Sequence, residues 1–363
     1  MGRLLLFLTF LSFQGLGQQK QSFNEKDLLG DWTGIKTKQN AYPIEGFSFK
    51  ANHIFEFKLG FFERIDDKSK FLGTRGKYKL EKGNLILFTP DAKTWAKLKL
   101  LGLHQKHLKI STNEGVFDFS RSVIGNPSSL TFDKIIVSAS GSFEPVPVSN
   151  TVINANGTVV FEGVDETSKI GLFSGTINAR DYLKIQADFN KSNLTKLTAW
   201  YRASSSDRQT ISTTFIKNGK IYKTIADYGE AAPYLFKAAY IPVIFMYQNM
   251  PLKALPDPVY LKNVDLNFRK SDQMLDIRQS ELFMLREALR NGKFVQKVFF
   301  RRFKFFKYKP NSNKFDELYT DGRYYQFFIN GKQIVVDIGF NFYDFNSDKW
   351  RWKKDYGSVS MYH

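Results

Sequence analysis

The stretch Gly46–Gly60, with the sequence GFSFKANHIFEFKLG, decides the fold of the N-terminal part of the chain. Apolar and polar residues alternate on both sides of Ala51-Asn52-His53, and a period of two residues places alternate side chains on opposite faces of a β-strand. The stretch therefore predicts two strands joined by a turn.

The same pattern continues through residues 26–122. Alternating or β-forming residues recur in Gly76–Phe88, Lys97–Leu103 and His107–Ser111, and no helical period interrupts them. A meander of short strands has two exposed edges, and closing the sheet into a barrel removes them. We therefore predict an antiparallel β-barrel domain over residues 26–122.

Short motifs in this block match a known family. Leu29-Gly30-Asp31-Trp32 contains Gly-x-Trp, Gly76-Lys77-Tyr78 follows it, and a Gly-Asn turn leads into Leu85-Ile86-Leu87. With these motifs the block resembles the lipocalin-like domains. The resemblance implies an antiparallel barrel and, as one functional expectation, a small hydrophobic ligand carried inside it.

Residues 130–250 differ from the first block, because strand and helix patterns alternate in them. Asn156-Gly157 and Asn218-Gly219 each separate two apolar runs, and Asn-Gly favours a two-residue hairpin turn in which both residues have positive φ. Residues 179–189 have apolar side chains at helical spacing, and Pro233 lies where a helix can begin without losing a hydrogen bond. These patterns predict an α+β domain with an antiparallel sheet.

Several segments of this middle domain match a second family: Phe132-Asp133-Lys134-Ile135, Gly157–Gly163 (GTVVFEG), Ile170–Ile177, and Lys223–Gly229 (KTIADYG) before Ala232-Pro233. With them the domain resembles the exported family known as domain of unknown function 6438. Members typically carry two cysteines around a Gly/Pro loop, where this chain has Ser142 and Val146-Pro147. Because both cysteines are missing together, the pair resembles a dispensable disulfide more than a catalytic thiol. The resemblance implies a fold and no activity.

Residues 257–363 predict a β-rich C-terminal region with one helix, either a separate domain or an extension of the middle one. Ser280 is the expected N-cap of that helix, and Asn291-Gly292 ends it. The apolar face of the helix carries Leu282, Phe283, Leu285 and Leu289. A hairpin is expected to turn at Asn330-Gly331. The chain as a whole therefore predicts an α+β multidomain protein.

The N-terminus has the pattern of an export signal. Met1-Gly2-Arg3 is positively charged, residues 4–13 are mostly apolar, and Gly15-Leu16-Gly17 places small residues where a signal peptidase cleaves. The apolar run is shorter than the roughly 20 residues that span a bilayer. We therefore expect residues 1–17 to be a signal peptide, and the protein to be exported to the periplasm, the outer-membrane surface or the extracellular space.

Composition limits the chemistry of the protein. The chain has no cysteine, which excludes disulfides, thiol catalysis and thiolate metal sites. The formal net charge is +18. For an exported protein the expected polyanion is an acidic glycan, lipopolysaccharide or an anionic membrane surface rather than nucleic acid. A basic composition also keeps a protein soluble without a ligand, so charge alone identifies no partner.

The most basic stretch is Val298–Lys309, VFFRRFKFFKYK, which contains no acid. As a strand with one bulge at Phe305-Phe306, it places Phe303, Phe305, Phe306 and Tyr308 in the core and Arg302, Lys304, Lys307 and Lys309 outside. Two interpretations follow. The four cations either form a solvated outer face that discourages edge-to-edge aggregation, or they bind a polyanion.

No catalytic, metal or cofactor site is predicted. His104 and His107 flank a tight turn, but two histidines lack the further ligands that a zinc site needs. Nothing in the sequence marks His53 as a base. The favoured function is that of an exported, non-enzymatic cell-envelope protein that binds or scaffolds an unidentified ligand. The alternatives are a carrier of a small hydrophobic ligand in the N-terminal barrel, and a hydrolase whose site only the fold assembles.

Overall fold

The computed structural model describes residues 23–35, 46–122, 129–309 and 314–355. The chain divides into two compact units, one with residues 1–128, 187–194 and 233–245, and the other with residues 129–186, 195–232 and 246–363. The predicted signal peptide, residues 1–17, lies outside the described residues. No helix in the described part is long and apolar enough to span a membrane.

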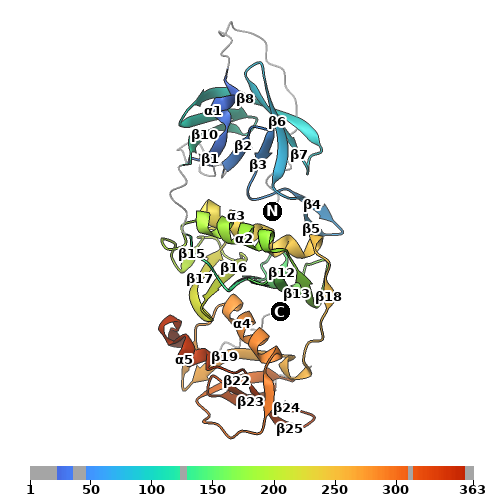
Figure 1. Ribbon diagram of the computed structural model, residues 1–363, viewed down its shortest axis with the longest axis vertical. Helices are drawn as coiled ribbons and strands as arrows, with labels where there is room; N and C mark the ends of the chain where they lie inside the picture. The colour runs from blue at the N-terminus through green and yellow to red at the C-terminus, as the bar shows by residue number, and fades with distance from the viewer. Residues whose placement is uncertain (1–22, 36–45, 123–128, 310–313, 356–363) are drawn as a thin grey trace. The chain divides into compact units, whose positions relative to one another are not determined.

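The strands of the first unit form a closed antiparallel barrel (Figure 1). Its strands are β1 (Gly30–Gly34), β2 (Gly46–Lys50), β3 (Ile54–Glu56), β6 (Arg75–Glu81), β7 (Asn84–Thr89), β8 (Thr94–His104), β9 (His107–Thr112) and β10 (Gly115–Arg121). Each pairs with its neighbour in this order, and β10 closes onto β1. The hairpin of β4 (Phe62–Ile65) and β5 (Lys68–Phe71) is inserted between β3 and β6. The predicted barrel is confirmed.

Side chains fill the interior of the barrel. An eight-stranded barrel is just wide enough for its inward-facing side chains to fill it. The buried set is aromatic and aliphatic, and comprises Leu28, Trp32, Phe47, Phe49, Phe55, Phe61, Tyr78, Leu85, Leu87, Leu98, Leu100, Leu103, Leu108, Ile110, Phe117 and Phe119. The rings of Phe49 and Tyr78, for example, meet edge to face at a centroid distance of 5.1 Å.

Arg121 closes one end of the barrel. Its guanidinium lies over the ring of Trp32 at 4.4 Å and donates to the carbonyl oxygens of Asp27 and Leu29. The Trp32 indole in turn donates to the carbonyl oxygen of Leu28 at 2.7 Å. These bonds tie the helix α1 (Glu25–Leu28) to β1 and β10, the two strands at which the barrel closes.

The middle sheet belongs to the second unit and has eight strands. In spatial order these are β15 (Trp200–Arg202), β17 (Lys220–Tyr228), β16 (Thr210–Lys217), β11 (Lys134–Ala139), β12 (Val148–Asn154), β13 (Thr158–Asp165), β14 (Gly171–Thr176) and β18 (Lys253–Ala254). All neighbours are antiparallel except β15 and β17. The predicted helices are present as α2 (Ala179–Lys191) and α3 (Tyr234–Phe245). The α+β class with an antiparallel sheet is therefore confirmed, with β15 as a parallel addition at the edge.

The two predicted Asn-Gly hairpins form, but their turns differ. Asn218 and Gly219 have φ values of 52° and 74°, as a type I′ turn requires. In the other hairpin Gly157 has a φ of 84°, whereas Asn156 does not have a positive φ. The Asn156 side-chain oxygen instead accepts from the backbone N–H of Thr158 at 3.0 Å, a local contact that stabilises a different turn. The expectation of two positive φ values is wrong there.

The C-terminal sheet also has eight strands. Their spatial order is β21 (Lys293–Val295), β25 (Lys332–Asp337), β24 (Tyr324–Ile329), β23 (Phe315–Thr320), β22 (Phe303–Tyr308), β19 (Val264–Lys270), β20 (Gln273–Leu275) and β26 (Trp352–Lys354). Short helices flank it: η2 (Val259–Leu261), α5 (Phe342–Phe345) and η3 (Ser347–Lys349). The helix η1 (Met246–Asn249) instead lies against the middle sheet, where the Tyr247 ring stacks on that of Phe161 at 4.3 Å.

The helix α4 (Gln279–Arg290) packs between the middle and C-terminal sheets (Figure 1). Phe283, Leu285 and Leu289 are buried in one cluster with Ile136 of the middle sheet and Phe327 of the C-terminal sheet. This shared core places both sheets in one compact unit.

Ser280 does not cap α4 as predicted. The N-cap is Arg278, whose backbone N–H donates to the Glu281 carboxylate at 2.7 Å. Ser280 lies inside the helix and is fully buried, with its hydroxyl 2.8 Å from that of Thr214 and its N–H donating to the Ser212 hydroxyl. The Ser280 hydroxyl and N–H therefore bind the middle sheet. A serine in this role cannot be distinguished from an N-cap serine by sequence alone.

The predicted bulge in the basic strand is wrong. β22 pairs with β23 in continuous register from Phe303 to Tyr308, so side chains alternate strictly. Phe303 and Phe305 are buried at 2% and 0% exposure, whereas Phe306 is only half-buried and lies on the opposite face. The irregularity is in the partner strand β19, between Asp265 and Arg269.

Candidate functional site

The four predicted polyanion-binding cations lie along and beside β22, but they do not form a free basic row. Three pair with carboxylates: Arg302 with Asp344 at 2.6 Å, Lys304 with Glu317 at 3.4 Å, and Lys309 with Asp316 at 2.9 Å. The Lys307 ammonium lies 3.4 Å from the carbonyl oxygen of Val259. A ligand for this strand must therefore compete with acids already in place.

A pocket of about 410 Å³ lies at the start of β22, beside Arg302. Its lining comes from the β19–β20 turn, the entry to β22, α5 and the edge strand β26, and comprises Lys270, Ser271, Asp272, Gln273, Arg302, Phe303, Tyr343 and Trp352. The fold thus brings one predicted cation together with residues that lie far from it in sequence.

Aromatic side chains hold the Arg302 guanidinium in this pocket. It lies 4.6 Å from the ring centre of Tyr343, whose ring is 4.7 Å from that of Phe303. The Trp352 indole N–H donates to the Tyr343 hydroxyl at 3.3 Å. Tyr343 and Trp352 are half-buried, so part of each ring stays accessible. The rings therefore position a cation beside apolar surface, a combination that suits a ligand with both charge and an apolar face.

Lys270 supplies a second cation at the pocket. Its side chain is exposed, and among the described residues it has no carboxylate within 4.0 Å. Asp272 and Gln273 add an acceptor and an amide, which can bond hydroxyl groups. The pocket can therefore hold an acidic group at Lys270, beside the Arg302 guanidinium that Asp344 already pairs, while hydroxyls of the same ligand meet Asp272 and Gln273.

A second hollow of about 370 Å³ lies at the other end of β22. Lys307, Asp316, Phe328 and Gly331 line it. Its lining has one cation, one acid and a single ring, so it has fewer groups that can bind an anionic ligand than the pocket at Arg302.

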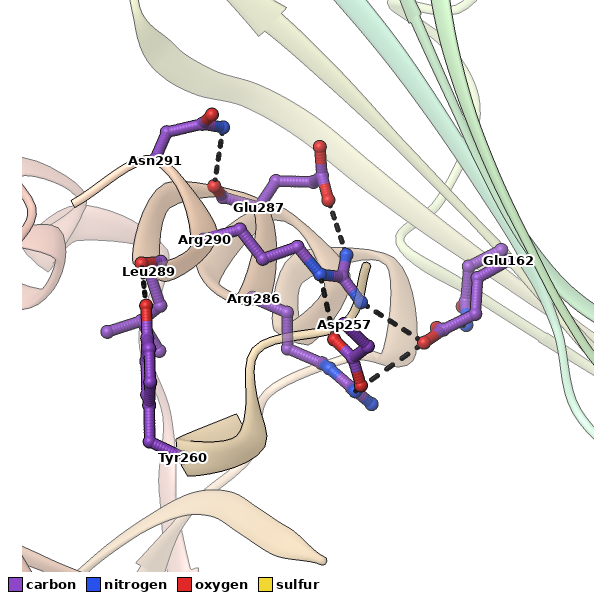
Figure 2. A network of polar contacts seen from close by, with 9 residues as sticks. Glu162, Asp257, Tyr260, Arg286, Glu287, Leu289, Arg290 and Asn291 are labelled. Carbon is purple, nitrogen blue, oxygen red and sulfur yellow. Dashed lines mark hydrogen bonds and ion pairs between the residues drawn. The ribbon is translucent and has the colours of Figure 1, made fainter. Parts of the chain in front are cut away.

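A largely buried group of charges lies elsewhere, around the arginines of α4 (Figure 2). Arg290 is 8% exposed, and its guanidinium contacts three carboxylates: Glu162 of β13 at 3.2 Å, Asp257 at 3.3 Å, and Glu287. Burial acts to lower the pKa of Arg290, but the three carboxylates raise it overall. Arg286 approaches Glu162 and Asp257 at 3.5 and 3.6 Å.

This network joins elements and has the features of a structural contact. Glu162 comes from the middle sheet, Asp257 from the segment before η2, and both arginines from α4. Every carboxylate in it faces an arginine, so no charge is left for a substrate (Figure 2). Buried ion pairs of this kind lose much stability when one partner is removed, although intact pairs contribute little.

Two short motifs of the C-terminal sheet, around Asp321 and Asp337, stabilise its turns. Arg323 forms a two-pronged pair with Asp337, at 2.8 and 2.9 Å. The Asp321 carboxylate accepts from the backbone N–H groups of Arg323 and Tyr324, both at 2.8 Å. Both motifs therefore have structural roles at the β23–β24 turn.

Acidification is expected to weaken the Arg323–Asp337 pair. The hydrogen bonds from Arg323 hold the pKa of Asp337 below its usual value. Because the folded-state pKa is the lower one, the pair stabilises the fold above the unfolded-state pKa of about 4, and the contribution is lost as pH falls through the folded-state pKa. In thermal melts between about pH 2 and 7, Asp337→Asn should lower the Tm at neutral pH and flatten the decline in acid. Asp316→Asn, which removes an exposed pair with Lys309, is the control and should keep the decline; equal pH curves for both variants would contradict the assignment.

The histidines do not assemble a catalytic or metal site in the described part of the chain. His104 and His107 face each other across the β8–β9 turn, and His107 lies 3.3 Å from Asp118. His53 lies 3.1 Å from Glu25 on the barrel surface and is 61% exposed. No group of three or more metal-ligating side chains occurs among the described residues.

Sequence reasoning found Arg302 but missed the other residues of its pocket. Lys270 is the last residue of β19, before the two-residue turn in which Ser271 has a φ of 54°, and nothing local marks it. The basic and aromatic composition around Trp352 was a visible signal. Its position beside Arg302 follows only from the pairing of β26 with β20, which no short motif predicts.

Comparisons with known proteins add a family match for one part of the chain. No curated protein matches it. Among solved structures, the Helicobacter pylori beta clamp bound to a DNA ligase peptide matches this chain at 9% identity and a TM-score of 0.12. The match covers 86% of this chain and 94% of the clamp chain. The match to the H. pylori beta clamp in complex with 5-chloroisatin covers 86% of this chain and 78% of the clamp chain, with the same identity and TM-score. TM-scores this low do not indicate a shared fold. Residues 133–247, by contrast, match the family model of the domain of unknown function DUF6438.

Proposed function

We propose that this is an exported, non-enzymatic protein of the cell envelope that binds an acidic glycan in the pocket at Arg302. The observation that carries the proposal is the meeting of two cations with two accessible rings in a hollow of about 410 Å³. A sugar with a carboxylate, sulfate or phosphate has all three features that the lining complements: an anionic group, hydroxyls and an apolar ring face. The export signal predicted at residues 1–17 supports a location where such glycans occur.

The proposed role of the barrel is structural. Its eight-stranded meander, the Gly30-Asp31-Trp32 motif on β1 and the Arg121 contact over Trp32 support a lipocalin-like identity. The interior, however, is filled by the protein's own side chains, with Phe55, Leu85 and Phe119 at 0% exposure. We therefore favour glycan binding over a hydrophobic-ligand carrier. The hydrolase alternative has no specific observation in its favour.

Removing the free cation of the pocket should weaken glycan binding without affecting the fold. For Lys270→Gln we expect the Kd for a sulfated oligosaccharide such as a heparin tetrasaccharide to rise about tenfold, which corresponds to a loss of about 1.4 kcal/mol. Isothermal titration calorimetry against this probe and against an uncharged maltotetraose measures the effect, and the parent should prefer the sulfated sugar.

Lys253→Gln is the matched control. Lys253 lies in β18 at the edge of the middle sheet and is equally exposed, so this variant loses the same net charge at a different place. The control should bind as the parent does. Equal losses in both variants would mean that only the overall charge matters, and no loss in Lys270→Gln would refute the pocket.

A further inference from the structure

The segment between β21 and β22, residues 296–302, has an exposed apolar pair that the proposed pocket does not use. Val298 is 95% exposed and Phe300 is 77% exposed. The pattern of the sequence predicts a strand from Val298, but β22 begins only at Phe303. Two large apolar side chains held this far into solvent within three residues are unusual for a protein surface without a partner.

Contacts on either side of the pair hold the segment against the C-terminal sheet. The Phe299 ring stacks on Tyr324 at a centroid distance of 6.2 Å, and the Lys297 ammonium lies 5.8 Å from the same ring. The Arg301 guanidinium lies 4.7 Å from the ring of Tyr319. Residues 297, 299 and 301 thus face the sheet, which turns residues 298 and 300 outward.

The exposed pair is flanked by cations. Lys297 and Arg301 are exposed, and in the parts of the chain that the structure describes neither has a carboxylate within 4.0 Å. Arg302 follows immediately and is half-buried. An apolar tip between free cations matches the interface of an anionic lipid layer, where head groups carry negative charge and the acyl region lies beneath them.

We propose that residues 297–301 dock the protein on an anionic lipid surface. Val298 and Phe300 enter the apolar region below the head groups, while Lys297 and Arg301 contact the head groups themselves. The ring contacts of Phe299 and Arg301 keep the tip ordered, which limits the conformational entropy lost on docking. This surface uses none of the residues assigned to glycan binding, so it goes beyond that function and can be tested separately.

Vesicle binding tests the proposal directly. The probe is a set of vesicles of phosphatidylcholine with about 30% phosphatidylglycerol, compared with pure phosphatidylcholine, in a flotation assay. The full chain without its predicted signal peptide should bind the anionic vesicles, and raising the salt concentration should weaken binding because it screens the cations. For Val298→Ser/Phe300→Ser we expect the partition coefficient to fall at least about tenfold, since burial of large apolar side chains is lost. Lys297→Gln/Arg301→Gln should bind less and lose most of the salt dependence.

Phe143→Ser is the matched control for the apolar pair. Phe143 is 88% exposed in the β11–β12 loop, so its replacement removes similar apolar surface at another place. This variant should bind vesicles as the parent does, and Lys270→Gln, the glycan-site variant, should do so too. If Phe143→Ser and the double serine variant lose binding equally, the docking site is not here.

A tryptophan at the tip reports insertion. In Phe300→Trp, measured as the difference from the parent spectrum, the added emission should shift to shorter wavelength and be quenched by brominated acyl chains when anionic vesicles are added. Binding without such a shift would overturn insertion. Self-association is the competing outcome: if the parent dimerises without lipid, and Val298→Ser/Phe300→Ser is monomeric, the tip covers a second copy of the chain and the proposal fails.

Discussion

Replacing Arg290 with methionine is expected to lower the free energy of unfolding by about 3–5 kcal/mol. The substitution keeps a long apolar stem but removes the guanidinium that faces Glu162, Asp257 and Glu287. Glu162 and Glu287 are 11% and 10% exposed, so the substitution leaves both carboxylates in a poorly solvated place with fewer hydrogen-bond and charge partners. Chemical denaturation followed by circular dichroism measures the loss.

Two variants separate this effect from simple packing. Arg286→Met removes a neighbouring guanidinium from the same helix, but Arg286 is 29% exposed, and we expect a loss of only about 1 kcal/mol. The double variant Arg290→Met/Glu162→Gln should lose less than the sum of its two single changes, because the second change removes a buried charge whose nearer arginine the first change has taken away. Additive losses would show that the charges of Arg290 and Glu162 do not stabilise the fold together.

The barrel and the hairpins were predictable because their signals are local. Alternation around Phe47 and Phe55 reflects which face of a strand is buried, and the Asn218-Gly219 turn needs only two residues that tolerate positive φ. The turn at Lys82-Gly83, which joins β6 to β7, follows from the same rule, because both residues have positive φ. Each of these features depends on a few neighbouring residues, so a short stretch of sequence is enough to predict it.

The facing of β22 was not predictable, because it depends on a distant residue. From sequence, Phe306 looks like a core residue. In the structure it lies on the outer face, where the Arg269 guanidinium covers its ring at 4.7 Å and is itself paired with Asp265 at 3.1 Å and Asp355 at 3.0 Å. The fold tolerates a half-buried phenylalanine on that face because the Arg269 side chain shields its ring from solvent. The hydrophobic pattern of the strand does not predict this contact.

The candidate site was only partly predictable for a similar reason. The concentration of cations and aromatics around Arg302 was visible, but a composition does not say which cations are already paired. Asp344, Glu317 and Asp316 neutralise three of the four predicted residues from other elements. Lys270, Lys297 and Arg301 have no carboxylate within 4.0 Å in the part of the chain that the structure describes, so they are the better candidates for an anionic ligand.

Truncating Phe305 to alanine is expected to lower the free energy of unfolding by about 3–5 kcal/mol. Phe305 is fully buried, and its ring lies 5.6 Å from that of Phe327 and 6.1 Å from that of Tyr325. The cavity left behind would sit in the core shared by α4 and both sheets, where neighbours on three elements limit collapse. Urea unfolding with intrinsic tyrosine and tryptophan fluorescence measures the change.

The neighbouring side chains make this prediction a test of the strand's facing. Lys304→Gln removes an exposed ion pair at 3.4 Å and should change stability by less than about 0.5 kcal/mol. Phe306→Ala should cost clearly less than Phe305→Ala, because Phe306 is half-buried under Arg269 and its loss leaves an open surface in place of a closed cavity. Under the bulged strand expected from sequence, Phe305 and Phe306 would both be core residues and both would be costly. Equal large losses for the two would therefore restore the bulge, whereas a large loss for Phe305 alone fits the continuous register of β22 with β23.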